Sequence, residues 1–128
     1  EHGMERDALW YTGVPQQLRV QEECPGCLLM PDPGPNENLE QTFAKFEKGP
    51  RIIASVMKFC SEGFVEAAHD RRAIVITDEG SPDDWPKMLE WGMDGIQTDQ
   101  PARLIEYLIA PRASGTPRIP PVVGQALR

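Results

Sequence analysis

The cysteines are the first residues of the chain whose types and spacing could do chemistry. Cys24 and Cys27 enclose Pro-Gly, which is the spacing of a redox pair or of half a zinc site. A redox cysteine needs the start of a helix, where the helix dipole lowers its pKa, but this pair precedes the apolar run LLM. Zinc needs two more ligands, and Cys60, His2 and His69 are scattered single residues. We expect a structural turn with buried or free thiols, with a disulfide or redox role and a zinc site as the alternatives.

A second candidate is the short stretch WGMDGIQTDQP, whose notable residues are Gly92, Asp94, Gly95, Thr98, Asp99 and Pro101. Gly92 can end a helix as its C′ residue, and Asp94 with the glycine after it can turn the chain into a short strand. Thr98 and Asp99 offer oxygen atoms to the N–H groups of the next helix, whose first turn holds Pro101. We expect a mainly structural role, with Asp99 as a helix cap; the alternative is that Asp99 orders a neighbouring active-site group.

The pattern of apolar residues predicts strands and helices in alternation. The strands are expected at 8–12, 27–32, 51–59, 73–77 and 94–98, and the helices at 14–23, 36–48, 61–71, 81–92 and 100–110. Such alternation with short links indicates parallel strands joined by right-handed crossovers, as in an α/β barrel or a doubly wound sheet. No glycine-rich phosphate loop follows a strand, which disfavours dinucleotide binding.

Single residues predict where some helices begin and which face they bury. Asn36 and Ser61 each precede an amphipathic stretch and are candidate N-caps. In the last helix Leu104, Ile105 and Leu108 are expected to face inward.

The stretch 91–101 resembles the closing motif of the glycerophosphodiester phosphodiesterases, which reads Gly-x-Asp-Gly-Ile-x-Thr-Asp-x-Pro. The preceding stretch 64–79, FVEAAHDRRAIVITDE, is similar to the penultimate unit of that family, in which a helix ends in Ala-His before a short turn and an apolar strand. His69 matches this helix-end histidine, which lies in the outer ring rather than at the active face. The resemblance covers most of residues 8–108 and is strongest over 64–101.

This resemblance implies an α/β fold, namely the C-terminal part of a (β/α)8 TIM barrel with parallel strands alternating with helices. It implies hydrolysis of glycerophosphodiesters to an alcohol and glycerol 3-phosphate, a reaction of lipid and glycerol metabolism. In the family two histidines act as acid and base, and a divalent cation, Mg²⁺ or Ca²⁺, is held by Glu and Asp carboxylates. Those groups come mainly from the first half of the barrel, which begins with a His-Arg-Gly motif that this sequence lacks.

A complete barrel needs roughly 250 residues, and the chain has 128. We therefore expect residues 1–110 to form the C-terminal part of such a barrel, followed by a proline-rich flexible tail at 111–128. Catalytic residues and most metal ligands are expected outside this chain, which would be a fragment without phosphodiesterase activity of its own. The alternatives are a non-catalytic, barrel-derived module that binds a sugar phosphate or another protein, and a CxxC redox or metal protein.

The active face of a (β/α)8 barrel lies at the carboxyl ends of its strands, which indicates three candidate substrate-binding residues. Asp78 could orient substrate hydroxyls or a water molecule near the cation, or it could be a loop carboxylate that caps the following helix. Lys58 could neutralise a phosphate, or be a solvated lysine. Trp10 or Tyr11 could form an apolar wall over the glycerol or head group, or pack in the core.

Charge and hydropathy bear on partners. The net charge of −7 argues against a nucleic-acid-binding surface, and no apolar run reaches the ~20 residues that a membrane span needs. A partial barrel would leave strand edges and apolar faces uncovered, so self-association through these edges is expected. The compartment stays unknown, although cysteines without a complete disulfide framework slightly favour the cytoplasm.

Overall fold

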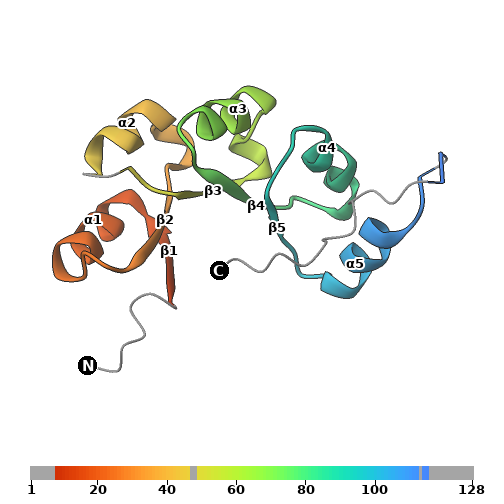
Figure 1. The fold of residues 1–128 in the computed structure, drawn as a ribbon, viewed down its shortest axis with the longest axis horizontal. Helices are drawn as coiled ribbons and strands as arrows, with labels where there is room; N and C mark the ends of the chain where they lie inside the picture. The colour runs from red at the N-terminus through yellow and green to blue at the C-terminus, as the bar shows by residue number, and fades with distance from the viewer. Residues whose placement is uncertain (1–7, 47–48, 113, 116–128) are drawn as a thin grey trace. The chain divides into compact units, whose positions relative to one another are not determined.

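The computed structural model describes residues 8–46, 49–112 and 114–115 (Figure 1). Within these residues five strands alternate with five α-helices. The strands are β1 (Leu9–Gly13), β2 (Leu28–Asp32), β3 (Ile52–Val56), β4 (Ile74–Asp78) and β5 (Gly95–Gln97), and the α-helices are α1 (Val14–Glu23), α2 (Leu39–Lys45), α3 (Glu62–Asp70), α4 (Trp85–Glu90) and α5 (Pro101–Ile109). The alternation predicted from the sequence is confirmed.

All pairs of strands are parallel. β1 pairs with β2, and β3, β4 and β5 pair in that order. In this described part of the chain β2 lies beside β3 without a hydrogen-bonded ladder between them. The chain divides into two compact units, Glu1–Gln97 and Thr98–Arg128, so that all five strands belong to the first unit and α5 to the second. Most of the predicted proline-rich tail, 111–128, lies outside the described residues.

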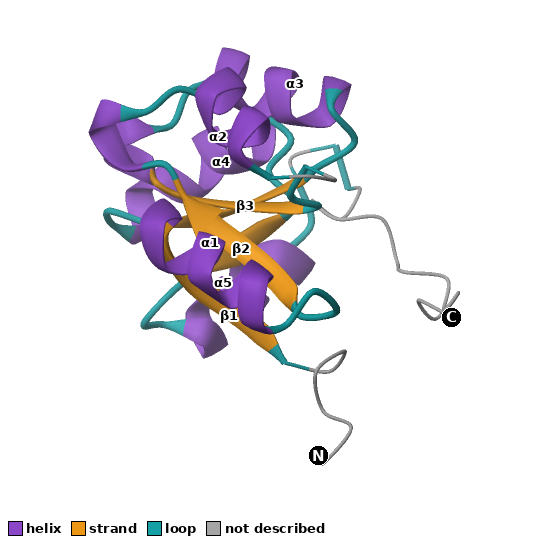
Figure 2. Ribbon diagram, turned by 90° about the vertical axis from the view of Figure 1, so that its left-hand side faces the viewer, coloured by secondary structure: helices purple, strands orange, loops and turns teal. Residues whose placement is uncertain are grey.

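Among the described residues of the first unit, helices cover one face of the strands and leave the other open. Val75 and Thr77 point to the covered face and are fully buried, and α2, α3 and α4 lie together on one side of β3 (Figure 2). Because side chains alternate along a strand, Ile74 points to the opposite face, where it is 42% exposed. Leu9 and Leu28 lie in register on β1 and β2 and are similarly exposed. Helices outside and a second apolar face inside is the arrangement of an α/β barrel.

Several element boundaries differ from the predicted ones, and two of the differences come from local turns and caps. β3 stops at Val56, since Met57–Phe59 forms a 3₁₀ turn. The N-cap of α2 is Asn38 rather than Asn36, and Asn38 and Gln41 exchange hydrogen bonds in a capping box. This box needs Gln or Glu three residues after the cap, which only Asn38 has.

Two other expectations about helices have opposite outcomes. Ser61 is the N-cap of α3 as predicted, and its hydroxyl accepts a hydrogen bond from the Phe64 N–H at 3.2 Å. In α5 Leu104 is buried, but Ile105 is 58% exposed, so its predicted inward position is wrong. Ile105 lies about 100° around the helix from Leu104, at the flank of the apolar stripe.

The glycines of the closing motif allow a short path from α4 into β5. Gly92 has φ +74°, and the N–H groups of Gly92 and Met93 donate to the carbonyls of Leu89 and Met88. These two bonds form a Schellman motif, which confirms the predicted C′ role of Gly92. At Gly95 a Cβ atom would lie 3.1 Å from Ile76 Cγ1, so the missing side chain lets β5 approach β4 closely.

Asp94 connects the beginnings of β4 and β5 by hydrogen bonds. Its carboxylate Oδ2 accepts a hydrogen bond from the Val75 N–H at 2.7 Å, and its own N–H donates to the Val75 carbonyl at 3.1 Å. The same oxygen lies 2.8 Å from His69 Nε2 at the end of α3. One carboxylate therefore joins two strands and a helix at the amino ends of the strands.

The end of the closing motif corrects one prediction. The N-cap of α5 is Gln100, no side chain caps this helix, and Asp99 is exposed. Asp99 is one residue too early, because a capping side chain belongs to the N-cap residue itself. The Thr98 hydroxyl instead accepts a hydrogen bond from the Gln100 N–H at 2.9 Å, and Pro101 is the first residue of α5 as predicted.

Two variants within the motif test these different roles. Asp94→Ala removes the acceptor of the Val75 N–H and of His69, and we expect it to lower the free energy of unfolding by about 1–3 kcal/mol. Asp99→Ala is the matched control and should change it by less than about 0.5 kcal/mol. Urea unfolding of both variants gives the comparison, and equal effects would show that Asp94 has no special role.

Candidate functional site

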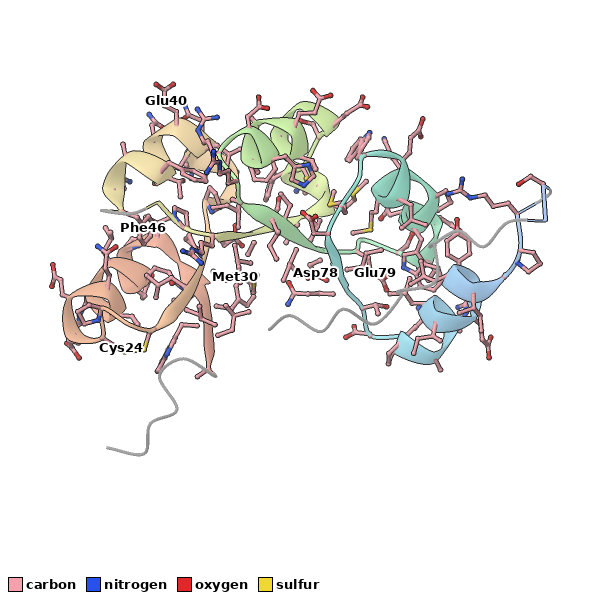
Figure 3. The ribbon with its side chains drawn as sticks, viewed as in Figure 1. Cys24, Met30, Glu40, Phe46, Asp78 and Glu79 are labelled. Atoms are coloured by element: carbon pink, nitrogen blue, oxygen red, sulfur yellow. A yellow bond between two sulfur atoms is a disulfide. The ribbon has the colours of Figure 1, made fainter. Side chains whose placement is uncertain are left out.

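The carboxyl ends of the strands bring polar side chains to the uncovered face of the first unit. Tyr11 on β1, Asp32 at the end of β2 and Asp78 at the end of β4 all lie on this face. Asp78 is in register with Val56 on β3 and with Gln97 on β5. Figure 3 shows Met30 and Asp78 on the side of the sheet turned away from α2 and α3. We refer to Tyr11, Asp32, Asp78 and Gln97 as the carboxyl-edge cluster.

The phenol of Tyr11 lies near both carboxylates of this cluster and is hydrogen-bonded to one of them. Its hydroxyl donates to Asp32 Oδ2 over 3.4 Å, a long hydrogen bond. The pKa of Tyr11 is raised above its usual value, first by burial, then by the charge of Asp32 and the hydrogen bond to it, and last by the charge of Asp78. Both carboxylates thus lie close enough to disfavour a phenolate. The cluster presents hydrogen-bond acceptors and negative charge, which suit hydroxyl groups or cations.

Gln97 contributes a polar atom to the same edge. Its Oε1 is buried and makes no hydrogen bond within the described residues. A buried acceptor without a donor costs free energy, so this oxygen can take a donor from outside the described part of the chain.

Of the predicted substrate-binding residues, Asp78 is exposed at the expected edge, whereas Trp10 does not share its face. Tyr11 reaches Asp32, and the adjacent Trp10 points the opposite way because neighbouring side chains alternate. Trp10 lies on the helix-facing side of β1 and is 48% exposed there. Tyr11, the alternative to Trp10 for an aromatic wall, shares the face of Asp78 and is close enough to feel its charge.

Lys58 follows β3 in the 3₁₀ turn Met57–Phe59 and is exposed. Its ammonium group lies 5.4 Å from the centre of the Phe59 ring, a distance at which cation–π attraction operates. Lys58 thus lies on the loop after β3, where its long side chain extends into solvent and can approach a bound group.

Glu79, the residue after Asp78, belongs to the fold rather than to the cluster. Its carboxylate accepts a hydrogen bond from the indole N–H of Trp85, which is 3% exposed. Its backbone N–H donates to the Gln97 carbonyl at 3.2 Å. Figure 3 shows Glu79 beside Asp78 near β5. Neighbouring side chains therefore point to opposite faces here: Asp78, the last residue of β4, faces the cluster, and Glu79 contacts Trp85 of α4.

The cysteine pair differs from the main expectation. Cys24 and Cys27 form a disulfide, where free thiols were expected. The Pro-Gly turn brings their Cα atoms to 5.5 Å, a normal separation for a disulfide, and the Cys27 N–H donates to the Cys24 carbonyl. Cys60 is the free cysteine, and burial raises the pKa of its thiol. The disulfide also removes the argument from thiols for the cytoplasm.

The described residues do not by themselves form a cation site. No group of three or more His, Cys, Asp or Glu side chains in this part of the chain could hold a metal ion. Two carboxylates, Asp32 and Asp78, occupy the edge, and His69 is held by Asp94 at the opposite ends of the strands. Among the described helices, none is long and apolar enough to cross a membrane.

Comparisons with known proteins bear on the fold. No protein-family model and no curated protein matches the chain. A solved structure does match, the "Crystal Structure of a putative glycerophosphodiester phosphodiesterase from Galdieria sulphuraria", with a TM-score of 0.70 and 18% sequence identity. The chain shares the fold of part of that protein. The match covers 82% of this chain and 45% of that one, so the chain spans less than half the length of its structural neighbour.

This similarity confirms the predicted fold class, parallel strands alternating with helices as in a TIM barrel of the phosphodiesterase type. The resemblance first indicated by residues 64–101 therefore extends to the arrangement of most of the chain. Sequence reasoning gave Tyr11 as the alternative to Trp10, and it did not single out Asp32 or Gln97. Side chains alternate along a strand, so once the register is known, the residues at the strand end that point to the open face can be named.

The pKa of Tyr11 tests whether the cluster forms. In a Tyr107→Phe background only one of the two tyrosines remains. We expect Asp32→Asn to lower the pKa of Tyr11, because it removes a negative charge and weakens the hydrogen bond. Asp78→Asn should lower it less, and the control Asp70→Asn, at the end of α3, should leave it unchanged. Ultraviolet absorbance measured against pH reports the phenolate, and an unchanged pKa in Asp32→Asn would contradict the geometry.

Proposed function

We propose that the chain contributes part of the wall and active edge of a glycerophosphodiester phosphodiesterase barrel. The observation that carries this proposal is the structural match over 82% of the chain, together with a closing motif that resembles that of the family at residues 91–101. The reaction would hydrolyse a glycerophosphodiester to an alcohol and glycerol 3-phosphate.

In this proposal the residues of the chain bind and orient substrate. Asp78 and Tyr11 face the uncovered side and would hydrogen-bond glycerol or head-group hydroxyls. Lys58, on the loop after β3, would approach the phosphate from its exposed position. Trp10, on the other face of β1, would reach a head group only at the rim of the barrel.

The acid, the base and the metal ligands are proposed to lie outside this chain. His69 is engaged by Asp94 far from the carboxyl edge, and His2 lies outside the described residues. A divalent cation, Mg²⁺ or Ca²⁺, would stabilise charge on the phosphate when bound in the complete barrel. Asp32 and Asp78 would orient groups around it without forming its site alone.

The proposed barrel also explains the apolar side chains on the uncovered face. Leu9, Leu28 and Ile74 are each more than 40% exposed, and burying them is favourable. The remaining strands of a barrel would cover these side chains. If no other strands do so, the same apolar face would drive association of two copies of the chain.

Activity measurements decide the proposal. We expect the pure chain to give no turnover of glycerophosphocholine with Mg²⁺ or Ca²⁺, because it lacks the histidine pair. The full product of its gene, assayed in parallel, should release glycerol 3-phosphate. Turnover by the pure chain would show that it is not an inactive part. A full product without turnover would favour a non-catalytic binding module.

The disulfide makes a redox protein a second candidate, but the position of Cys24 argues against it. Cys24 follows the C-terminal end of α1 rather than the start of a helix, where the dipole disfavours a thiolate. Alkylation of the reduced chain at different pH values distinguishes the two functions, because a redox function requires one thiol with a lowered pKa.

A further inference from the structure

Three arginines border a hollow at the amino ends of β3 and β4. Arg51 precedes β3, and Arg71 and Arg72 lie between α3 and β4. Together with Phe43 and Pro50 they line an open hollow of about 670 Å³, which we call the arginine groove. It lies at the ends of the strands opposite to Asp78, and it is not used by the proposed function.

The backbone holds the walls of the groove in place. The Ile74 N–H donates to the Arg51 carbonyl at 2.9 Å, which fixes the segment before β3 against the segment before β4. Gly49 has φ +64°, and a Cβ atom there would lie 3.1 Å from the Phe43 ring. The backbone at Gly49 thus packs closely against the Phe43 ring, and both residues line the groove.

Arg71 is positioned before any ligand arrives. Its guanidinium lies 5.7 Å from the centre of the Phe43 ring, and Nη1 donates to the Ala67 carbonyl at 3.0 Å. An arginine held in this way loses less side-chain freedom on binding and retains further N–H groups for a ligand.

Arg72 occupies a backbone position that favours glycine. Its φ is +60°, and it is the C′ residue of a Schellman motif in which the N–H groups of Arg72 and Ala73 donate to His69 and Ala68. A side chain in this left-handed conformation costs about 1 kcal/mol relative to glycine. The arginine is therefore present although local conformation disfavours it.

No carboxylate of the described residues pairs with these arginines. Lys45–Glu37 and His69–Asp94 are ion pairs of this part of the chain, and neither involves an arginine of the groove. Three arginines thus line one hollow in a chain whose net charge is −7. Guanidinium groups without carboxylate partners bind phosphate oxygens in bidentate geometry.

We propose that the arginine groove binds a small organic phosphate. The phosphate would lie against Arg51, Arg71 and Arg72, and the apolar part of the molecule against Phe43 and Pro50. The volume of about 670 Å³ falls within the range of small-molecule sites, roughly 300–1,000 Å³. The inference rests on the groove alone and does not depend on phosphodiesterase activity.

Calorimetric titration of the chain with phenyl phosphate, inorganic phosphate and phenol tests the site. We expect phenyl phosphate to bind more tightly than inorganic phosphate, phenol not to bind, and added NaCl to weaken binding. Arg72→Gly and Arg71→Gln should each weaken phenyl phosphate binding about tenfold or more. Arg19→Gln, the same loss of charge on the exposed side of α1, should change it less than about twofold.

Arg72→Gly separates binding from folding, because glycine suits the left-handed position and the variant should unfold at no lower urea concentration than the parent. A folded Arg72→Gly variant with unchanged affinity would overturn the proposal. So would the absence of saturable binding, or an equal loss in Arg19→Gln. Equal affinity for phenyl phosphate and inorganic phosphate would overturn the role of Phe43 and Pro50.

Discussion

The position of β5, the last strand of the first unit, depends on the hydrogen bonds of the Asp94 carboxylate. β5 has three residues, so its ladder to β4 is short and gives little control over register. Asp94 adds two bonds with the backbone of Val75, one through its side chain and one through its N–H. The contact with His69 extends the same connection to the end of α3. Register along β5 is therefore determined at its beginning rather than by its length.

The register in turn decides what stands at the carboxyl ends. With Ile76 opposite Gly95, Asp78 must lie opposite Gln97. A slip of β5 by one residue would turn Gln97, not Asp78, to the helix-covered face, where an amide without a partner would be costly. The glycine at position 95 reinforces this arrangement, since any side chain there would meet Ile76. Gly95 and the Asp94 carboxylate, at the amino end of β5, thus set the orientation of Gln97 at its other end.

The sequence was sufficient for the elements but not for the contacts between them. Alternating apolar runs predicted the βα order, and the position of Gly92 after an amphipathic stretch predicted its turn. The sequence left Trp10 and Tyr11 as alternatives because both are aromatic, and only the facing of β1 says which one shares the face of Asp78. The pairing of His69 with Asp94 joins residues far apart in the chain, and no local pattern indicates it. For Cys24 and Cys27 the spacing allowed a disulfide, yet a free pair has the same sequence.

The carboxyl-edge cluster and the arginine groove lie at opposite ends of the strands and differ in charge, and this has a consequence for phosphate chemistry. Asp32 and Asp78 stand at the carboxyl ends, while Arg51, Arg71 and Arg72 stand at the amino ends. A phosphodiester is negatively charged, so the carboxylates alone would repel it. Binding at the carboxyl edge therefore requires positive charge from Lys58 or from a cation held outside the described residues. At the arginine groove the protein supplies the positive charge itself, so a phosphate can bind there without any metal ion.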